Sequence, residues 1–515
     1  MPVIDFEQIN TAEFHPHANV CIVGGGIAGL LLAFKLGKAG TDVLLLEAGG
    51  TSLEERSQNL YAAEMANAVH VGTMQGRFRT LGGSSIRWGG QLLPYTEDVL
   101  HPPPETGLPQ WPIAFEEIAP YFDEVVALLG ANELPFDASL LNTLGLEKAG
   151  FNEQIRLRFS KWLPFSRRNL TNTVGKQVAA MSNVRIVTHA NVLRFVRQED
   201  RITAAEIRDY SGHAAIVTAD TFVLSAGTIE SSRIMLLSGL GGNQTGRYFH
   251  DHISVPVGEF TGRARTEWLR RLGPFFVEGN LHTCKLEASS SLRKQHGMLA
   301  VMAHIVIQEP EDSGMAAIRN FLRALQHRKS GEGVRCIAPL LRGSLDVARL
   351  LWSTKVRKRR SVSKRARVLL AIDLEQEPST ENCIRLSEEK DPIGMQRAVV
   401  QWAVSPRERR TVAQFAHHLR TAMQEAGLPE PQWFDGVLNA EICTREFSDT
   451  FHAMGGLRMG TDVASSVVDR DLRVHETENL YIASCAVYPT GGSSNPTFTL
   501  GALTLRLADH LLKGK

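Results

Sequence analysis

The sequence has few of the features that mark several common protein classes. Only six of its 515 residues are cysteine and no CxxC pair occurs, which argues against a zinc site, an iron–sulfur cluster and a c-type haem. Scattered thiols favour a reducing compartment, so we expect a cytoplasmic protein. No stretch reaches the roughly 18 apolar residues of a membrane span. The opening residues, MPVIDFEQIN, predict no export signal.

The sequence also lacks an excess of positive or of negative charge. Lys and Arg number 56 and Asp and Glu 55, a net charge of +1, so nothing attracts nucleic acid or acidic lipid globally. The exception is KVRKRRSVSKRAR at 355–367, which holds eight basic residues and no acidic one. Such a run is usually a solvated face, and the alternative is a weak contact with a membrane surface or an anionic partner.

What the sequence does contain is a nucleotide-binding unit near its start. The apolar run 20–23 predicts a buried parallel strand that leads into Gly24 and Gly26, and Gly29 follows in the first turn of an apolar helix. In this pattern the first glycine permits a tight turn, the second lets the backbone approach a pyrophosphate, and the third lets helix and strand pack closely. The amides at the helix start then face the phosphates.

A second strand and an acidic residue complete the unit. The apolar run 43–46 ends at Glu47, where a carboxylate can accept hydrogen bonds from ribose hydroxyls. Strand, helix, second strand and acid therefore stand in the order of a dinucleotide site. The alternative is a glycine-rich turn that binds no ligand.

Further segments indicate an α/β fold with more than one domain. The chain is too long for one compact core, so we expect two or three domains. The glycine-rich stretch 76–95 predicts a loop whose backbone lies close to a ligand. Ala226 and Gly227 open a helix that also starts beside the ligand. Strand character recurs at 184–195, 202–209 and 215–226, and helical character at 315–352, 407–425 and 499–512.

These signals divide the chain between two domains. Residues 1–98, 183–248 and 446–515 are predicted to form a discontinuous nucleotide-binding domain. Residues 99–182 and 249–445 are predicted to form a second, substrate-binding domain. The histidines of the sequence HDH at 250–252 alternate as metal ligands on a strand do, but no further ligand clusters with them, so we expect a structural or substrate-side role and no metal.

Several motifs together resemble the glucose–methanol–choline (GMC) family of flavin-dependent oxidoreductases, and they span most of the chain. The motifs are GGGIAG with Glu47, LGGSSIRWGG, WPIAFEEIAPYF, VLSAGTIESSRIML, FHAMGGLRMGTDVASSVVD and NLYIASCAVYPTGGSSNPTFTLGALTLRLADHL. The segments RWGG and PTGGSSNPT are most similar to bacterial sugar- or polyol-oxidising members. The resemblance implies a Rossmann-like FAD-binding domain and an α+β substrate domain built on an antiparallel sheet.

The resemblance also implies an active site. His452 and Asn495 fall where the family keeps its two active-site residues. A histidine suits a base of near-neutral pKa, an asparagine can orient the substrate hydroxyl, and flavin N5 accepts the hydride. Residues expected to line FAD are Gly24, Gly26, Gly29, Glu47, Gly82, Gly83, Ser84, Trp88, Val192, Ala226, Gly227, Ser484, Pro496 and Thr497.

Two departures from the family pattern affect the flavin. Members with covalently attached flavin carry a histidine in the LGGSS loop, whereas this chain has Arg87 before Trp88, so we expect non-covalent FAD. Many members have Asp-Ala-Ser after the NLYI-like strand, whereas this chain has Ser-Cys-Ala at 484–486. That change leaves the local hydrogen bond to the flavin open.

The function implied is FAD-dependent oxidation of a CH–OH group in a sugar, glycoside or polyol. The electron acceptor is oxygen, a quinone or a redox protein, and the sequence does not distinguish them. Alternatives are a non-sugar alcohol as substrate, a non-redox lyase or light-driven decarboxylase, and a flavin-binding subunit without activity. Trp162, Phe165 and Arg167 are candidates for lining a sugar pocket.

Overall fold

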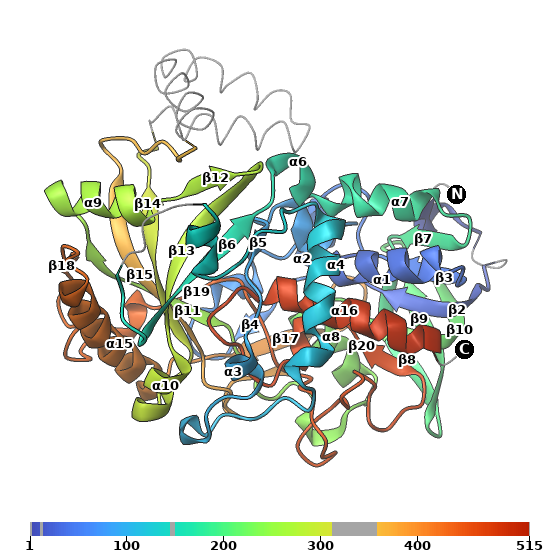
Figure 1. Ribbon diagram of the computed structural model, residues 1–515. Helices are drawn as coiled ribbons and strands as arrows, with labels where there is room; N and C mark the ends of the chain where they lie inside the picture. The colour runs from blue at the N-terminus through green and yellow to red at the C-terminus, as the bar shows by residue number, and fades with distance from the viewer. Residues whose placement is uncertain (1–2, 11–13, 145–149, 312–357, 514–515) are drawn as a thin grey trace.

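The computed structural model describes residues 3–10, 14–144, 150–311 and 358–513, arranged as two large sheets side by side (Figure 1). The predicted helical segment 315–352 and residues 355–357 of the basic run lie outside the described residues. Within the described ranges, no helix is both long and apolar enough to cross a membrane. The site lies where the two sheets meet.

The first sheet is the nucleotide-binding sheet that the sequence predicts. Its strand order is β1-β7-β3-β2-β10-β9-β8, with β20 also paired to β10. All pairings are parallel except β10–β9 and β9–β8. The bounds are β1 Ile4–Asp5, β2 His17–Val23, β3 Val43–Leu46, β7 Val184–Thr188, β8 Asn191–Gln198, β9 Arg201–Arg208, β10 Ala214–Leu224 and β20 Leu480–Ile482.

Helices from distant parts of the chain cover this sheet. α1 packs against α7 and α16, and α16 packs against α4 (Figure 1). α16 begins at Pro496, three residues before the predicted start, because proline suits the first turn of a helix. The bounds are α1 Ile27–Lys38, α4 Ala119–Leu129, α7 Val174–Ala180, α8 Thr228–Leu237 and α16 Pro496–Lys513.

The second sheet is antiparallel, with strand order β18-β11-β15-β14-β13-β6-β5, and β12 and β19 pair with β13 and β11. The bounds are β5 Gln91–Leu92, β6 Ile155–Trp162, β11 His252–Glu259, β12 Phe275–Val277, β13 Asn280–Ala288, β14 Val301–Gln308, β15 Arg367–Glu375, β18 Gln432–Trp433 and β19 Ser448–Asp449.

Helix α15, Pro406–Glu425, packs behind β14 and β15. Ser405 and Glu408 form a capping box at its start, next to a proline in the first turn, which explains why the helix begins there. A small sheet of β16 Cys383–Lys390, β17 Gln396–Gln401 and β4 Glu64–Met65 lies between the large sheets. The other helices are α2 Glu55–Asn59, α3 Glu97–Leu100, α5 Ser139–Thr143, α6 Phe165–Arg168, α9 Gly262–Leu272 and α10 Ser290–His296.

This arrangement confirms the predicted α/β class with a second, antiparallel sheet. The domain limits themselves stay a prediction. The strands of the two large sheets fall within those limits except β5 and β19, which come from the first-domain segments and pair with second-sheet strands. Helices α4 and α7 come from 99–182 yet pack on the helices of the nucleotide-binding sheet.

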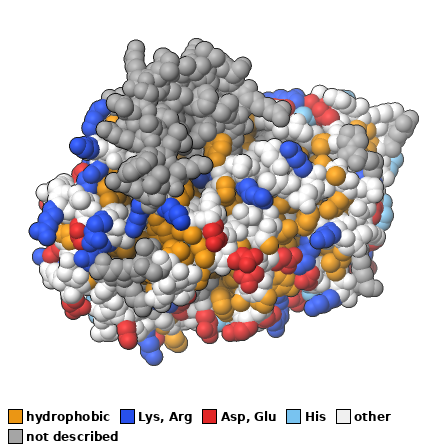
Figure 2. Space-filling view, turned by 45° about the horizontal axis from the view of Figure 1, so that its top comes forward, with side chains coloured by type: hydrophobic (Ala, Val, Ile, Leu, Met, Phe, Trp, Pro, Cys, Tyr) orange, Lys and Arg blue, Asp and Glu red, His pale blue; other side chains and the backbone are white. Residues whose placement is uncertain are grey.

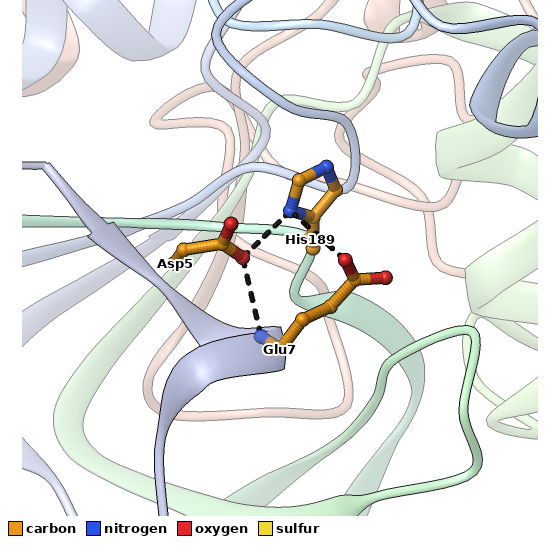
Figure 3. A group of neighbouring side chains, drawn as sticks. All are labelled: Asp5, Glu7 and His189. Atoms are coloured by element: carbon orange, nitrogen blue, oxygen red, sulfur yellow. Dashed lines mark hydrogen bonds and ion pairs between the residues drawn. The ribbon is translucent and has the colours of Figure 1, made fainter.

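An ion-pair cluster ties the N-terminal strand to the nucleotide-binding sheet (Figure 3). His189, between β7 and β8, has its Nδ1 2.7 Å from Asp5 and 3.9 Å from Glu7, and its Nε2 3.2 Å from Glu54. Burial alone would lower the pKa of His189, but hydrogen bonds and charges from Asp5 and Glu54 outweigh it and raise the pKa. The imidazolium therefore joins three carboxylates around β1.

Candidate active site

A cavity of about 220 Å³ lies where β2, β3, β10 and β20 end and the helices α1, α8 and α16 begin. Ligands of α/β sheets bind at this carboxyl edge. Most of the predicted cofactor residues line the cavity. They are Gly24, Gly26, Glu47, Gly83, Ser84, Val192, Ala226, Gly227, Ser484, Pro496 and Thr497.

The three glycines of the first unit each meet a different steric demand. Gly24 has φ +110°, and a Cβ there would lie 2.6 Å from the carbonyl oxygen of Ser225. A Cβ at Gly29 would lie 1.9 Å from the carbonyl oxygen of Gly24, so Gly29 allows helix and strand to touch. A Cβ at Gly26 would meet no atom within 4 Å, because that position faces the open cavity.

Donors for an anion converge on the same cavity. Gly26 caps α1 without a side chain, so the first amides of the helix remain available to a phosphate. Arg77 and Arg79 also line the cavity, and the Nε of Arg79 is buried without a hydrogen-bond partner. These donors fit the pyrophosphate of a dinucleotide such as FAD.

Glu47 provides the acceptor expected beside a ribose. Its Oε2 accepts from the amide of Gly25 and its Oε1 from the amide of Gly49, both at 2.8 Å. Burial raises the pKa of Glu47, and the hydrogen bonds from these amides oppose that shift. Each oxygen keeps a lone pair that a ribose hydroxyl can use.

Three of the residues predicted to line FAD are not among the described lining residues of this cavity. Gly29 is inside the helix–strand contact, and Gly82 donates its N–H to the carbonyl of Gly25 at 2.8 Å. Trp88 lines a neighbouring cavity instead, and its Nε1 donates to the carbonyl of Arg168 at 2.6 Å. Their roles are thus in shaping the loop and the second cavity.

The second cavity, of about 640 Å³, adjoins the first and faces the antiparallel sheet. His452 and Thr497 line both cavities, and Asn495 lines the second. Of the three candidates for a sugar pocket, Trp162 lines it, whereas Phe165 and Arg167 are not among its described lining residues.

His452 and Asn495 are in contact, as the resemblance implies. The Nδ2 of Asn495 lies 3.0 Å from the Nε2 of His452. On the other side of the ring, Nδ1 lies 2.9 Å from the Nδ1 of His252 and 2.8 Å from the Oγ1 of Thr450. The backbone amide of His452 donates to Asp251 at 3.0 Å.

This network assigns the tautomer of His452. The Nε2 of His252 lies 2.9 Å from the carbonyl oxygen of Gly491, which only accepts, so that nitrogen carries hydrogen. In the tautomer of His252 with hydrogen on Nε2, Nδ1 carries a lone pair, so the single proton between the two Nδ1 atoms belongs to His452. His452 therefore presents the lone pair of Nε2 to Asn495 and the cavity.

The environment also keeps His452 neutral. Burial is the largest cause that lowers the pKa of His452 to about 4; a second proton on His252 would lower it further, and the charge of Asp251 acts in the opposite direction. The sequence argument assumed a pKa near the ordinary value for histidine. The structure replaces that assumption with a base that is unprotonated throughout the neutral range.

The supporting residues were only partly found from the sequence. For the HDH motif the sequence predicts a structural or substrate-side role. The structure refines that role, because Asp251 and His252 both hydrogen-bond to His452. The Oδ2 of Asp251 also lies 3.1 Å from the Nε2 of His70. Thr450 was missed, and its position two residues before His452 was the available signal.

Comparisons with known proteins agree with this geometry. Models of the GMC oxidoreductase family match residues 164–254 and 378–504, and a model of an NAD(P)-binding Rossmann-like domain matches 22–69. The matched ranges include the HDH motif and the segments that hold His452 and Asn495.

Curated relatives and a solved structure extend the likeness over the chain. The 2-methyl-1,2-propanediol dehydrogenase of Mycolicibacterium austroafricanum is 22% identical, covering 96% of this chain and 95% of its own. The fructose dehydrogenase large subunit of Gluconobacter japonicus is 24% identical, covering 96% and 98%. The crystal structure of pyridoxine 4-oxidase from Mesorbium loti shares the fold, with a TM-score of 0.60 at 17% identity and coverage of 96% and 99%. The chain belongs to the GMC oxidoreductase family, a family of CH–OH-oxidising enzymes that typically use FAD.

Proposed function

We propose that this protein binds FAD non-covalently and oxidises a CH–OH group of a sugar, glycoside or polyol. The observation that carries the proposal is the neutral His452, whose Nε2 lies beside Asn495 at the junction of the two cavities. A diol dehydrogenase and a fructose dehydrogenase among the relatives support a polyhydroxy substrate.

Each residue has a defined task in that reaction. When bound, FAD supplies the acceptor for the hydride that leaves the carbinol carbon. Asn495 Nδ2 donates to the substrate oxygen and directs the O–H toward His452, whose Nε2 takes the proton. The positive charge that forms on the ring is stabilised by Asp251 and by the Nδ1–H bond to Thr450.

The loop after Gly83 supports the proposed non-covalent attachment of the flavin. Arg87 stands where covalently flavinylated relatives carry histidine, and it lines the second cavity with its guanidinium 5.1 Å from the ring of Phe78. A guanidinium does not bond covalently to a flavin, which supports non-covalent FAD. The described cysteines are all free thiols. The cytoplasmic location, which rests on the scattered cysteines of the sequence, stays a prediction.

A weak contact of the basic run with a membrane surface or an anionic partner also belongs to the proposal. Figure 2 shows basic side chains on both halves of the visible face, several of them over the half that holds the second sheet. In the described part of the run, Arg359 donates to the carbonyl of Gly273 directly after the arginine-rich helix α9. Delivery of electrons to a quinone would suit such a surface.

The proposal is tested by anaerobic mixing of the holoenzyme with a panel of sugars, glycosides, polyols and simple alcohols. A CH–OH donor should bleach the flavin, and later mixing with oxygen or a quinone should identify the acceptor by the rate of reoxidation. A flavin that stays oxidised with every donor would overturn the proposal and point to non-redox chemistry. Acid treatment that releases intact FAD checks the non-covalent attachment.

A further inference from the structure

A lysine on the polar face of the second sheet has no use in the reaction described so far. Lys285, on β13, is 3% exposed and lines the second cavity together with His452 and Asn495. Its Nζ has no hydrogen bond or ion pair with another described residue. Because a buried ammonium without a partner is costly, burial lowers the pKa of Lys285, and the charge of Asp373 opposes that shift. An anion bound beside Nζ would favour the ammonium form, so this position suits the anionic group of a ligand.

The neighbouring carboxylate does not fill that need. Lys285 is paired across the sheet with His304 on β14, and the Nε2 of His304 lies 2.7 Å from Asp373 on β15. Burial would raise the pKa of Asp373, but the charge of His304 and a hydrogen bond from it lower the pKa instead. Asp373 is thus engaged by His304 and reaches Lys285 only through longer-range attraction.

The charges around the cavity are unequal. Its described lining carries the guanidinium groups of Arg87 and Arg360 and the amino group of Lys285. Asp373 supplies the one carboxylate among these described lining residues. In a water-poor cavity an anionic ligand is attracted more strongly than at an exposed surface.

The ammonium also lies near the reacting atoms. The charge of Lys285 is close enough to contribute to lowering the pKa of His452. Thr283 and Gln91 line the same cavity, and their remaining polar atoms can bond to hydroxyl groups of a ligand. The second cavity therefore contains a position for an anion, polar side chains and the catalytic base.

We propose that the substrate is a polyhydroxy carboxylate, a sugar acid, whose carboxylate binds Lys285 while one of its carbinols contacts His452. This inference rests on the proposed function and narrows its substrate class. The carboxylate stays unchanged: the carbinol C–H bond breaks and its electron pair goes to the flavin, the O–H proton goes to Nε2 of His452, and the carbon–oxygen bond becomes a carbonyl.

The test compares each acid with its neutral counterpart in the holoenzyme. The dissociation constant for anaerobic flavin reduction is measured with D-galacturonate and D-galactose, with D-gluconate and D-sorbitol, and with D-glucose 6-phosphate. The acids should bind about 10- to 100-fold more tightly than the neutral compounds, as for a charge-assisted hydrogen bond. In Lys285→Gln this preference should disappear, and Lys285→Arg should keep part of it. Lys294→Gln removes a charge on exposed helix α10 and should leave the preference unchanged.

Each other outcome is informative. If neutral and acidic compounds reduce the flavin equally in the wild type, or if Lys285→Gln weakens both equally, the inference fails and the proposed function stands. Preference for the phosphate over both acids also overturns it. Calorimetric titration of the oxidised holoenzyme with galacturonate needs no turnover: binding that depends on Lys285 supports the anion position even if no donor reduces the flavin, and absence of binding excludes it.

Discussion

The two adjoining cavities are built by different means. The cofactor cavity lies at the ends of neighbouring strands of the first sheet, where glycines such as Gly24 and Gly26 shape its lining beside charged groups such as Glu47. The substrate cavity is lined by apolar residues and by the ionisable side chains of Lys285, His304 and Asp373 on β13, β14 and β15. Changes in the first should therefore alter retention of FAD, and changes in the second should alter the rate, specificity and pH dependence of the reaction.

Removing the base should give the largest effect and should leave the cofactor cavity intact. His452→Ala is expected to lower the rate of flavin reduction by about 10²- to 10⁴-fold, the usual contribution of a positioned acid–base group. FAD content should stay at the wild-type level, which absorbance of the purified protein measures. A variant that reduces its flavin at the wild-type rate would show that the proton goes elsewhere.

Filling the cofactor cavity should give the opposite result. Gly26→Leu places a side chain where a Cβ would meet no atom within 4 Å. The backbone φ at this position is −77°, which any residue adopts without strain. The chain should fold, while FAD affinity falls by about 100-fold, or roughly 2 to 3 kcal/mol. Gly26→Ala is the matched control and should lose much less. Equal FAD affinity in the wild type and both variants would contradict the cofactor assignment.

Removing the support of the base should have a smaller effect on turnover. His252→Phe keeps a ring but loses one of the two acceptors beside Nδ1–H of His452, so the tautomer is less firmly held. We expect about a fivefold lower kcat, the value of one neutral hydrogen bond, with FAD retained. His250→Phe removes a buried imidazole that bonds only to the carbonyl of Tyr248 and should change kcat less. If kcat falls equally in the two variants, His252 does not hold the tautomer of His452.

The smallest effect is expected at the cluster around His189, whose side chain is not among the described lining residues of either cavity. Because the pKa of His189 is raised in the folded state, its stabilisation is complete below the unfolded pKa of about 6.5 and is lost as pH rises through the folded pKa. His189→Gln should lower the free energy of unfolding by about 1 kcal/mol at pH 6 and by less at pH 9. Denaturant unfolding at the two pH values measures this, and a loss that grows with pH would contradict the ion pairs.

The two cavities also differ in how far the sequence predicted them. Gly24, Gly26 and Glu47 could be placed because a nucleotide-binding unit has fixed spacing over about 30 residues. His452 and Asn495 came from a family resemblance, and their contact follows from it.

The residues that surround the base could not be placed in this way. His252, Lys285 and Asp373 meet through the register of antiparallel strands, and that register is set by packing rather than by a motif. The lowered pKa of His452 depends on the burial that the register creates, so a sequence pattern alone gives no sign of it.

The central claim, that a neutral His452 takes the substrate proton, is tested most directly by the pH dependence of anaerobic flavin reduction. A stopped-flow pH jump measures the rate constant before the protein unfolds in acid. The account predicts a constant rate at neutral pH that falls with decreasing pH through a midpoint of about 4, because protonated His452 cannot accept a proton. A midpoint near 6.5, the ordinary value for histidine, or an identical acid limb in His452→Ala, would contradict it.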